Sequence, residues 1–173
     1  MAILEFGINL GKKPLIEIKY YSLSDNILDP NIRAKFLTGI ENFIEEAFGD
    51  DINVISLSEY KLICYFKRIQ VPSKDVYKTK LLFSFAIIEQ DTDPDFVKTH
   101  LKEIIHEFRD SYPLSEIVSK DSHHFQKFKD RVNEILGDLR LKIDDRLRTI
   151  FREKNHENTA EDIESESEEE AED

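Results

Sequence analysis

The 173-residue chain has little of what several large classes of protein require. It contains a single cysteine, Cys64, so it forms no internal disulfide and offers no Cys-x-x-Cys pair for zinc or redox chemistry. No window approaches the roughly 18 consecutive apolar residues of a membrane-spanning helix. The first residues have no basic flank followed by a long apolar run, which argues against a secretory signal. We therefore expect a soluble, cytoplasmic protein.

Recognisable catalytic motifs are also missing. Ser84 lies in an apolar run without the Gly-x-Ser-x-Gly elbow of a nucleophilic serine. No Gly-x-x-x-x-Gly-Lys phosphate loop is present, and Gly11-Lys12 joins two predicted strands rather than a strand and a helix. We expect no catalytic residue, no bound cofactor and no metal, and we interpret the protein as a non-enzyme.

Acidic residues are concentrated at the C-terminal end. Residues 156–173 contain ten carboxylates and no Lys or Arg. Removing these ten from the net charge of -12 leaves -2 for residues 1–155, without a concentrated basic footprint for nucleic acid. Ile163 is the only large apolar residue of this tail, so we expect residues 155–173 to be disordered. A solubilising role is the simpler interpretation of the tail, and a regulatory role stays open.

Alternating apolar residues predict five strands. Residues 4–10 and 16–20 alternate with period two and flank a Gly-Lys turn, which is typical of a hairpin. Residues 52–57 and 61–70 predict two further strands. Residues 81–88 are almost continuously apolar, as in a central strand that is covered on both faces. We therefore predict an α+β fold with a five-stranded antiparallel sheet.

Helix signals separate and follow these strands. Asp29-Pro30 and Asp93-Pro94 each combine a capping carboxylate with a proline suited to the first turn. The first predicted helix runs to Gly49 and the second to Tyr112-Pro113. The order is thus β-β-α-β-β-β-α-α. The residues expected in the core include Phe36, Ile40, Phe83, Phe85, Leu101 and Ile105.

The third predicted helix begins at Asp121-Ser122 and is unusually long. Continued to Arg152 it would measure about 46 Å at about 1.5 Å per residue, more than the roughly 17–20 Å that a typical strand spans. It either breaks near Gly137-Asp138 or projects beyond the sheet. We divide the chain accordingly into a domain over residues 1–136, a helical extension over 137–154 and the acidic tail.

Four apolar residues of this extension recur at helical spacing. Fully burying each would stabilise the structure by roughly 1.5–3 kcal/mol, so leaving them in water favours a partner. We predict a partner interface here, with a homodimer slightly preferred over folding back into the chain's own core. The residues are Leu139, Ile143, Leu147 and Ile150.

Other polar candidates have simpler explanations. His100, Glu103, His106 and Glu107 lie close together on the second predicted helix, but no second cluster supplies further metal ligands, so we interpret them as solvated positions. His123-His124 are adjacent, and adjacent helical residues point in different directions. Cys64 has no activating neighbour in the sequence, which favours a small buried apolar role.

The order of elements resembles that of the longin, or SNARE-like, fold. Residues 4–16 resemble the opening hairpin of longin-type adaptor small chains, with Gly11-Lys12 in the turn. Residues 60–66, 81–88 and 93–108 resemble their middle hairpin and following helix. Roadblock domains share the sheet but begin with a helix. The chain departs from the minimal pattern in its long last helix and acidic tail, and no SNARE heptad segment follows the domain.

This resemblance implies a non-enzymatic interaction module of membrane-traffic machinery. Its partner would be another longin- or roadblock-type subunit or a small GTPase, with peripheral membrane association through that partner. Two alternatives stay open. One is an enzyme or small-ligand binder that uses the crevice between sheet and helices, and the other is an acidic-tailed chaperone of basic partners.

Overall fold

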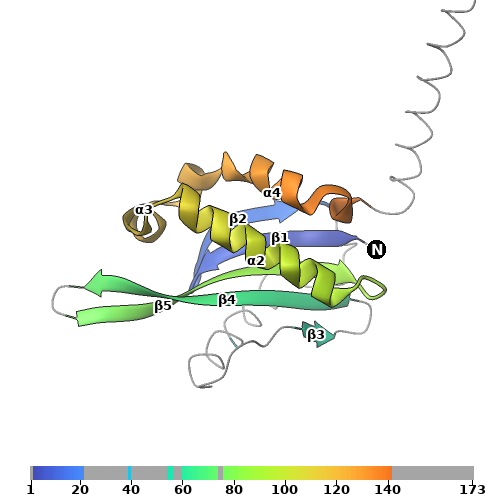
Figure 1. Cartoon of the computed structure of the whole chain (residues 1–173), viewed down its shortest axis with the longest axis horizontal. Helices are drawn as coiled ribbons and strands as arrows, with labels where there is room; N and C mark the ends of the chain where they lie inside the picture. The colour runs from blue at the N-terminus through green and yellow to red at the C-terminus, as the bar shows by residue number, and fades with distance from the viewer. Residues whose placement is uncertain (1, 22–38, 40–53, 57–59, 74–75, 142–173) are drawn as a thin grey trace, which may run out of the picture. The chain divides into compact units, whose positions relative to one another are not determined.

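The protein has an α+β architecture built on a five-stranded antiparallel sheet, as the sequence predicts (Figure 1). The chain divides into two units, Met1–Arg140 and Leu141–Asp173, and the sheet and the described helices belong to the first. The computed structural model describes residues 2–21, 39, 54–56, 60–73 and 76–141.

The N-terminal strand, β1, is an interior strand of the sheet, next to the edge strand β2. The strand order is β2-β1-β5-β4-β3, and every pair of neighbours is antiparallel. All residues of β1 are buried, which agrees with its place between β2 and β5. Gly11 has a φ of 56° in the turn between β1 and β2, a conformation that favours glycine. The strands are β1 Ile3–Leu10, β2 Lys13–Lys19, β3 Val54–Ser56, β4 Tyr60–Ser73 and β5 Val76–Glu89.

The described helices follow the sheet in the chain and pack on one of its faces (Figure 1). The Asp93 carboxylate accepts a hydrogen bond from the Asp95 amide at 3.0 Å, which confirms the predicted cap of α2. Tyr112 is extended because it precedes Pro113, and α2 ends there as expected. The helices are α2 Pro94–Ser111, α3 Leu114–Ser119 and α4 Phe128–Leu136, with 3-10 turns η1 Ser122–Phe125 and η2 Gly137–Arg140.

The region predicted as one long helix is interrupted twice. Asp121 caps a 3-10 turn, η1, rather than the α-helix itself, which begins at Phe128. The helix then ends at Leu136, because Gly137 has a φ of 47°, and η2 follows. The sequence left two alternatives, a helix broken near Gly137 or a continuous helix that projects beyond the sheet. The described residues show the break at Gly137. The short helix α3 was not predicted, since six residues are too few for a clear apolar period.

Buried side chains form one cluster on each face of the sheet. The helix-side cluster joins β1, β2, β4 and β5 to α2, α3 and α4, and contains Leu101 and Ile105. The opposite cluster contains Phe83 and Phe85, so four of the predicted core residues are confirmed. The predicted first helix over 30–48, with Phe36 and Ile40, lies outside the described residues except for Gly39, which is helical.

Gly7 has a steric reason to be glycine. It pairs with Phe85 across β1 and β5, and the Phe85 ring lies directly over it. A β-carbon built on Gly7 would approach ring atoms of Phe85 to 2.3 and 2.5 Å. Because Phe85 is fully buried, its ring has no open space into which to move.

The β4–β5 hairpin is longer than the sequence predicted. The strands pair from Tyr60 with Glu89 to Ser73 with Val76, whereas the apolar pattern indicated strands over 61–70 and 81–88 only. The far half of the hairpin extends past the ends of β1 and β2, and α3 lies beside it (Figure 1). The additional residues of β5, Val76–Lys80, are all exposed, which is why no apolar alternation was detected there.

Candidate functional site

The predicted interface stripe is described at only one of its four residues. Leu139 is 8% exposed and belongs to the helix-side cluster, where η2 packs against β1. Arg140 donates a hydrogen bond from Nε to the Gly137 carbonyl at 3.1 Å, which closes the turn. Leu139 is thus a core residue in this structure. Ile143, Leu147 and Ile150 lie outside the described residues, so their role stays a prediction.

The His and Glu residues of α2 do not converge on a metal site. Nδ1 of His100 lies 2.8 Å from the Phe96 carbonyl oxygen of its own helix. Glu107 is engaged by an arginine of α4. Within the part of the chain that the structure describes, no three His, Cys, Asp or Glu side chains come together to hold a metal ion.

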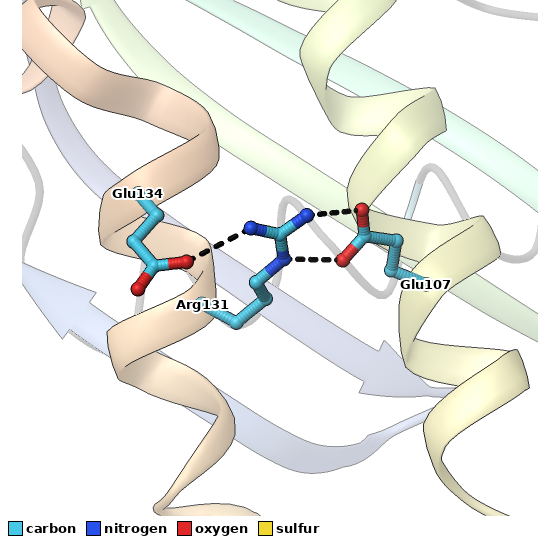
Figure 2. Close-up of polar contacts among 3 residues, drawn as sticks. All are labelled: Glu107, Arg131 and Glu134. Atoms are coloured by element: carbon cyan, nitrogen blue, oxygen red, sulfur yellow. Dashed lines mark hydrogen bonds and ion pairs between the residues drawn. The ribbon is translucent and has the colours of Figure 1, made fainter.

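Arg131 connects α2 to α4 (Figure 2). Its Nε and Nη2 donate to the two carboxylate oxygens of Glu107 at 2.5 and 2.7 Å, and Nη1 donates to Glu134 at 2.8 Å. The hydrogen bonds from Arg131 lower the pKa of Glu107, and those to Glu107 and Glu134 raise the pKa of Arg131. This bidentate pair fixes the spacing of the two helices on the exposed surface.

The two adjacent histidines have different surroundings. Nε2 of His124 lies 2.7 Å from a carboxylate oxygen of Glu116 on α3, and its ring packs edge-on against Phe125 at 5.1 Å between centroids. His123 is exposed, and its backbone amide donates to the Asp121 carboxylate. His124 therefore links α3 to η1 through Glu116 and Phe125.

Two candidate nucleophiles are buried in the sheet. Burial raises the pKa of the Cys64 thiol to about 12, so the thiol stays protonated at neutral pH. The Ser84 hydroxyl donates to the Leu101 carbonyl of α2 at 3.2 Å. Both side chains serve packing, and the small Ser84 side chain lets α2 lie close to the central strand β5.

The described residues also form a pocket that the sequence did not indicate. It lies between β4 and the corner where α2 ends and α3 begins, and its volume is about 340 Å³. Four consecutive residues of β4, 67–70, form one wall. The corner supplies the other wall through Arg109, Tyr112, Pro113, Leu114 and Ile117. The pocket arises because the extended Tyr112-Pro113 pair redirects the chain before α3 begins.

Cations surround this pocket. Lys67, Arg68 and Arg109 line it, and none of the described residues that line it carries a carboxylate. On β5, Lys80 pairs with Ile69 and Lys78 pairs with Val71. Directly opposed residues of an antiparallel pair point to the same face, so both lysines share the helix-side face with these two β4 residues. We call Lys67, Lys78, Lys80 and Arg109 the basic rim. Arg68 is left out because it pairs with Leu81 of the opposite face of the sheet.

The pocket lining mixes polar and apolar groups. Of its apolar residues, Ile69 and Ile117 are buried, and Leu114 is 36% exposed. Val76 and Tyr77 are more exposed, at 69% and 70%, and lie on the far half of the hairpin. The pocket lining thus combines cationic and apolar side chains, as many binding sites do.

Sequence reasoning missed this site for two reasons. Its walls come from segments about 40 residues apart in the chain, which only the fold brings together. The one available signal was the composition of residues 67–80, which include five Lys or Arg and a single carboxylate, Asp75. This local positive charge was obscured because residues 1–155 as a whole carry a net charge of only -2.

None of the helices among the described residues combines the length and apolarity needed to cross a bilayer. A scan against protein-family models finds no match to this chain, and a search of curated proteins finds none either.

Proposed function

We propose that the chain is a non-enzymatic, longin-like interaction module of membrane-traffic machinery. Its partner would be another longin- or roadblock-type subunit or a small GTPase, and it would reach a membrane peripherally through that partner. The observation that carries the proposal is the order of the described elements. Two strands form one edge of the sheet, three later strands complete it, and the helices after them cover one face. This order is what the longin resemblance implies for these parts of the chain.

The use made of polar side chains supports a binding role. Ser84 and Cys64 are buried in packing positions, and Glu107 is held by Arg131. These groups stabilise the fold, and none of them faces the pocket. A binding module needs a complementary surface rather than activated nucleophiles or acid–base groups. Polar side chains that stabilise the fold, as these do, are consistent with such a module.

The partner can be identified by purifying the tagged full chain from its native cells after mild crosslinking, followed by mass spectrometry. We expect a stoichiometric protein that carries a longin or roadblock domain or a GTPase fold, and the purified pair should form a complex on size-exclusion chromatography with light scattering. A chain that purifies alone and converts a metabolite would contradict the proposal. Binding that depends only on residues 156–173 would instead favour the acidic-tailed chaperone.

The predicted homodimer needs its own test. Leu147→Asp should convert a dimer to a monomer on light scattering, with an unchanged circular dichroism spectrum, because a carboxylate is costly in an apolar interface. Thr149→Asp introduces the same charge two residues away, off the apolar stripe, and should leave the dimer intact. A wild-type chain that is monomeric at high micromolar concentration would remove the homodimer and leave the heteromeric partner to be sought.

A small-ligand binder is the second candidate. The pocket of about 340 Å³ is near the lower end of the roughly 300–1,000 Å³ range of ligand sites, and its cations favour an anion. Thermal-shift screening with anionic metabolites separates the candidates. A specific rise in melting temperature that disappears in Arg109→Glu would favour the ligand binder.

A further inference from the structure

We propose that the open edge of β5, over residues 76–80, binds an extended segment of a partner protein as an additional antiparallel strand. This inference rests on the proposed interaction module and adds how that module holds its partner. It depends on where β1 ends beside β5, on the direction of the backbone groups at this edge and on the side chains that flank it.

β5 continues past the end of its neighbour β1 (Figure 1). The pairing of the two strands ends at Leu10 with Leu82, and the amide of Gly11 in the turn donates to the Leu81 carbonyl at 2.7 Å. Residues 76–80 therefore pair with β4 on one side and with no described strand on the other. All of them are exposed, and they span about 17 Å at about 3.4 Å per residue.

The backbone at this edge points unbonded groups away from β4. The Leu81 carbonyl accepts from Gly11, so the N–H and C=O of Leu81 face the β1 side of the strand. This direction repeats at every second residue, and Thr79 and Tyr77 therefore turn their N–H and C=O groups to the same side. Among the described residues, none bonds to these groups. The edge thus offers donors and acceptors for a further strand.

The other edge of the same hairpin is protected. β3 pairs with β4 only over Lys61–Ile63, so the outer part of β4 also lacks a described neighbour on that side. Pro72 pairs with Tyr77, and both residues of such a pair turn their backbone groups outward. Because Pro72 has no N–H, it interrupts the row of donors, a common protection against strand addition. Residues 76–80 of β5 contain no proline.

The lysines at the β5 edge disfavour a second copy of the chain as the occupant. Opposed residues of an antiparallel pair bond in the same way, so two copies of β5 related by a two-fold axis would be centred on a single residue. Centring on Lys78, Thr79 or Lys80 would place a lysine opposite a lysine, and directly opposed like charges destabilise a sheet. Centring nearer the start of the strand would pair residues 76–78 at most. A different protein is therefore the better partner.

The flanking side chains define the chemistry of the partner segment. Lys78 and Lys80 share the helix-side face, where carboxylates at the opposed positions would form favourable cross-strand pairs. Tyr77, which is 70% exposed, and Thr79 lie on the other face and favour β-branched or aromatic residues opposite them. The segment that fits this edge therefore alternates acidic residues with β-branched or aromatic ones.

Fluorescence anisotropy with the full chain tests the proposal. The probe is a fluorescein-labelled peptide in which glutamate alternates with valine and threonine. With glutamates opposite the lysines, the valine and threonine amides face β5 and the glutamate amides face away. N-methylation of the valine and threonine amides should therefore weaken binding by about tenfold or more, whereas N-methylation of the glutamate amides should change it by less than about threefold.

A matched pair of variants locates the site on the protein. Thr79→Pro removes an outward N–H from the β5 edge and should weaken probe binding by about tenfold or more. Gln70→Pro removes an outward N–H from the β4 edge at the residue that pairs with Thr79, and should change binding by less than about twofold. Melting curves check that both variants fold. If Thr79→Pro does not, the two methylated peptides still test the edge on the unaltered chain.

Other outcomes overturn the proposal. A probe that fails to bind at millimolar concentration would remove the edge as a site, and equal binding of the two methylated peptides would show attraction by charge alone. A wild-type dimer that Thr79→Pro converts to a monomer would make a second copy the occupant. Probe binding that appears only after removal of residues 156–173 would assign the edge to the chain's own tail. If the partner captured from native cells binds Thr79→Pro as well as the wild type, the interaction module stands and this edge assignment does not.

Discussion

Along the β4–β5 hairpin, the half that contains Phe83 and Phe85 is buried on both faces of the sheet, whereas the half that contains Tyr77 and Thr79 is exposed on β5. Both halves are paired without interruption in the same antiparallel register. Backbone pairing therefore accounts for the extended conformation of both, and burial distinguishes them. We infer that the inner half provides stability and that the outer half, which carries much of the basic rim, is free to vary for binding.

Thiol accessibility should give the largest difference between the halves. Cys64 lies in the inner half, and Thr79→Cys adds a thiol to the outer half. At pH 8 the added thiol should react with a disulfide reagent faster by about a thousandfold or more, because Cys64 reacts only after unfolding and its pKa is raised to about 12. Stopped-flow absorbance measures both rates. Two thiols reacting at similar rates would remove the distinction.

Truncation of an inner phenylalanine should have the largest effect on stability. Phe85→Ala removes a fully buried ring, and we expect the free energy of unfolding in urea to fall by about 3–5 kcal/mol. Tyr77→Ala removes an exposed ring from the outer half, and should change the same quantity by less than about 0.5 kcal/mol. Comparable losses would mean that the outer half is packed as well.

The contact between Gly7 and Phe85 tests how tightly the inner half is packed. Gly7→Ala should cost about 1–3 kcal/mol in urea denaturation, because the new methyl group meets the Phe85 ring. The smaller side chain in Phe85→Leu should relieve that conflict, so the double variant should lose less than the sum of the single losses. Additive losses would show that the clash is relieved elsewhere.

Ser84 provides a smaller test of the contact between β5 and α2. Ser84→Ala removes the hydrogen bond to the Leu101 carbonyl and should lower the free energy of unfolding by about 0.5–1.5 kcal/mol. Thr79→Ala removes an exposed hydroxyl from the outer half and serves as the control. An unchanged stability for Ser84→Ala would indicate that packing alone holds α2 against the sheet.

The smallest expected effect concerns the charges of the outer half. Lys78→Glu combined with Lys80→Glu should change the unfolding free energy by less than about 0.5 kcal/mol, since both side chains are exposed. Thermal denaturation followed by circular dichroism measures this change in unfolding free energy. A large loss would mean that these lysines stabilise the hairpin, and they would then be poor candidates for a free binding surface.

Much of the sheet could be predicted from the sequence because its signals are local. Alternation identified β1 and β2, and the cap at Asp93 identified the start of α2. Each of these signals lies within the element that it specifies. The outer part of β5, from Val76 to Lys80, gave no apolar alternation, since it is held extended by pairing with β4 rather than by burial.

The pocket could not be predicted because it depends on contacts between distant segments. Lys67 and Arg109 become neighbours of one cavity only once β4 and α2 pack together. The break at Gly137 was recognised as one of two alternatives, because glycine in a helix pattern signals a stop without requiring one. Leu139 was assigned to an interface stripe, but the turn after Gly137 places it in the core.

The interior position of β1, between β2 and β5, has a consequence for synthesis of the chain. Leu10 pairs with Leu82 and Ile3 pairs with Ile88, so the first strand made has no neighbour on its β5 side until about 80 more residues have been added. At about 5–20 residues per second, ribosomes need about 4–16 s for this. A lone two-stranded hairpin is only marginally stable in water, and an open apolar edge invites pairing with other chains. The nascent N-terminal hairpin is therefore a segment at risk of aggregation, although its first strand is completely buried in the finished sheet.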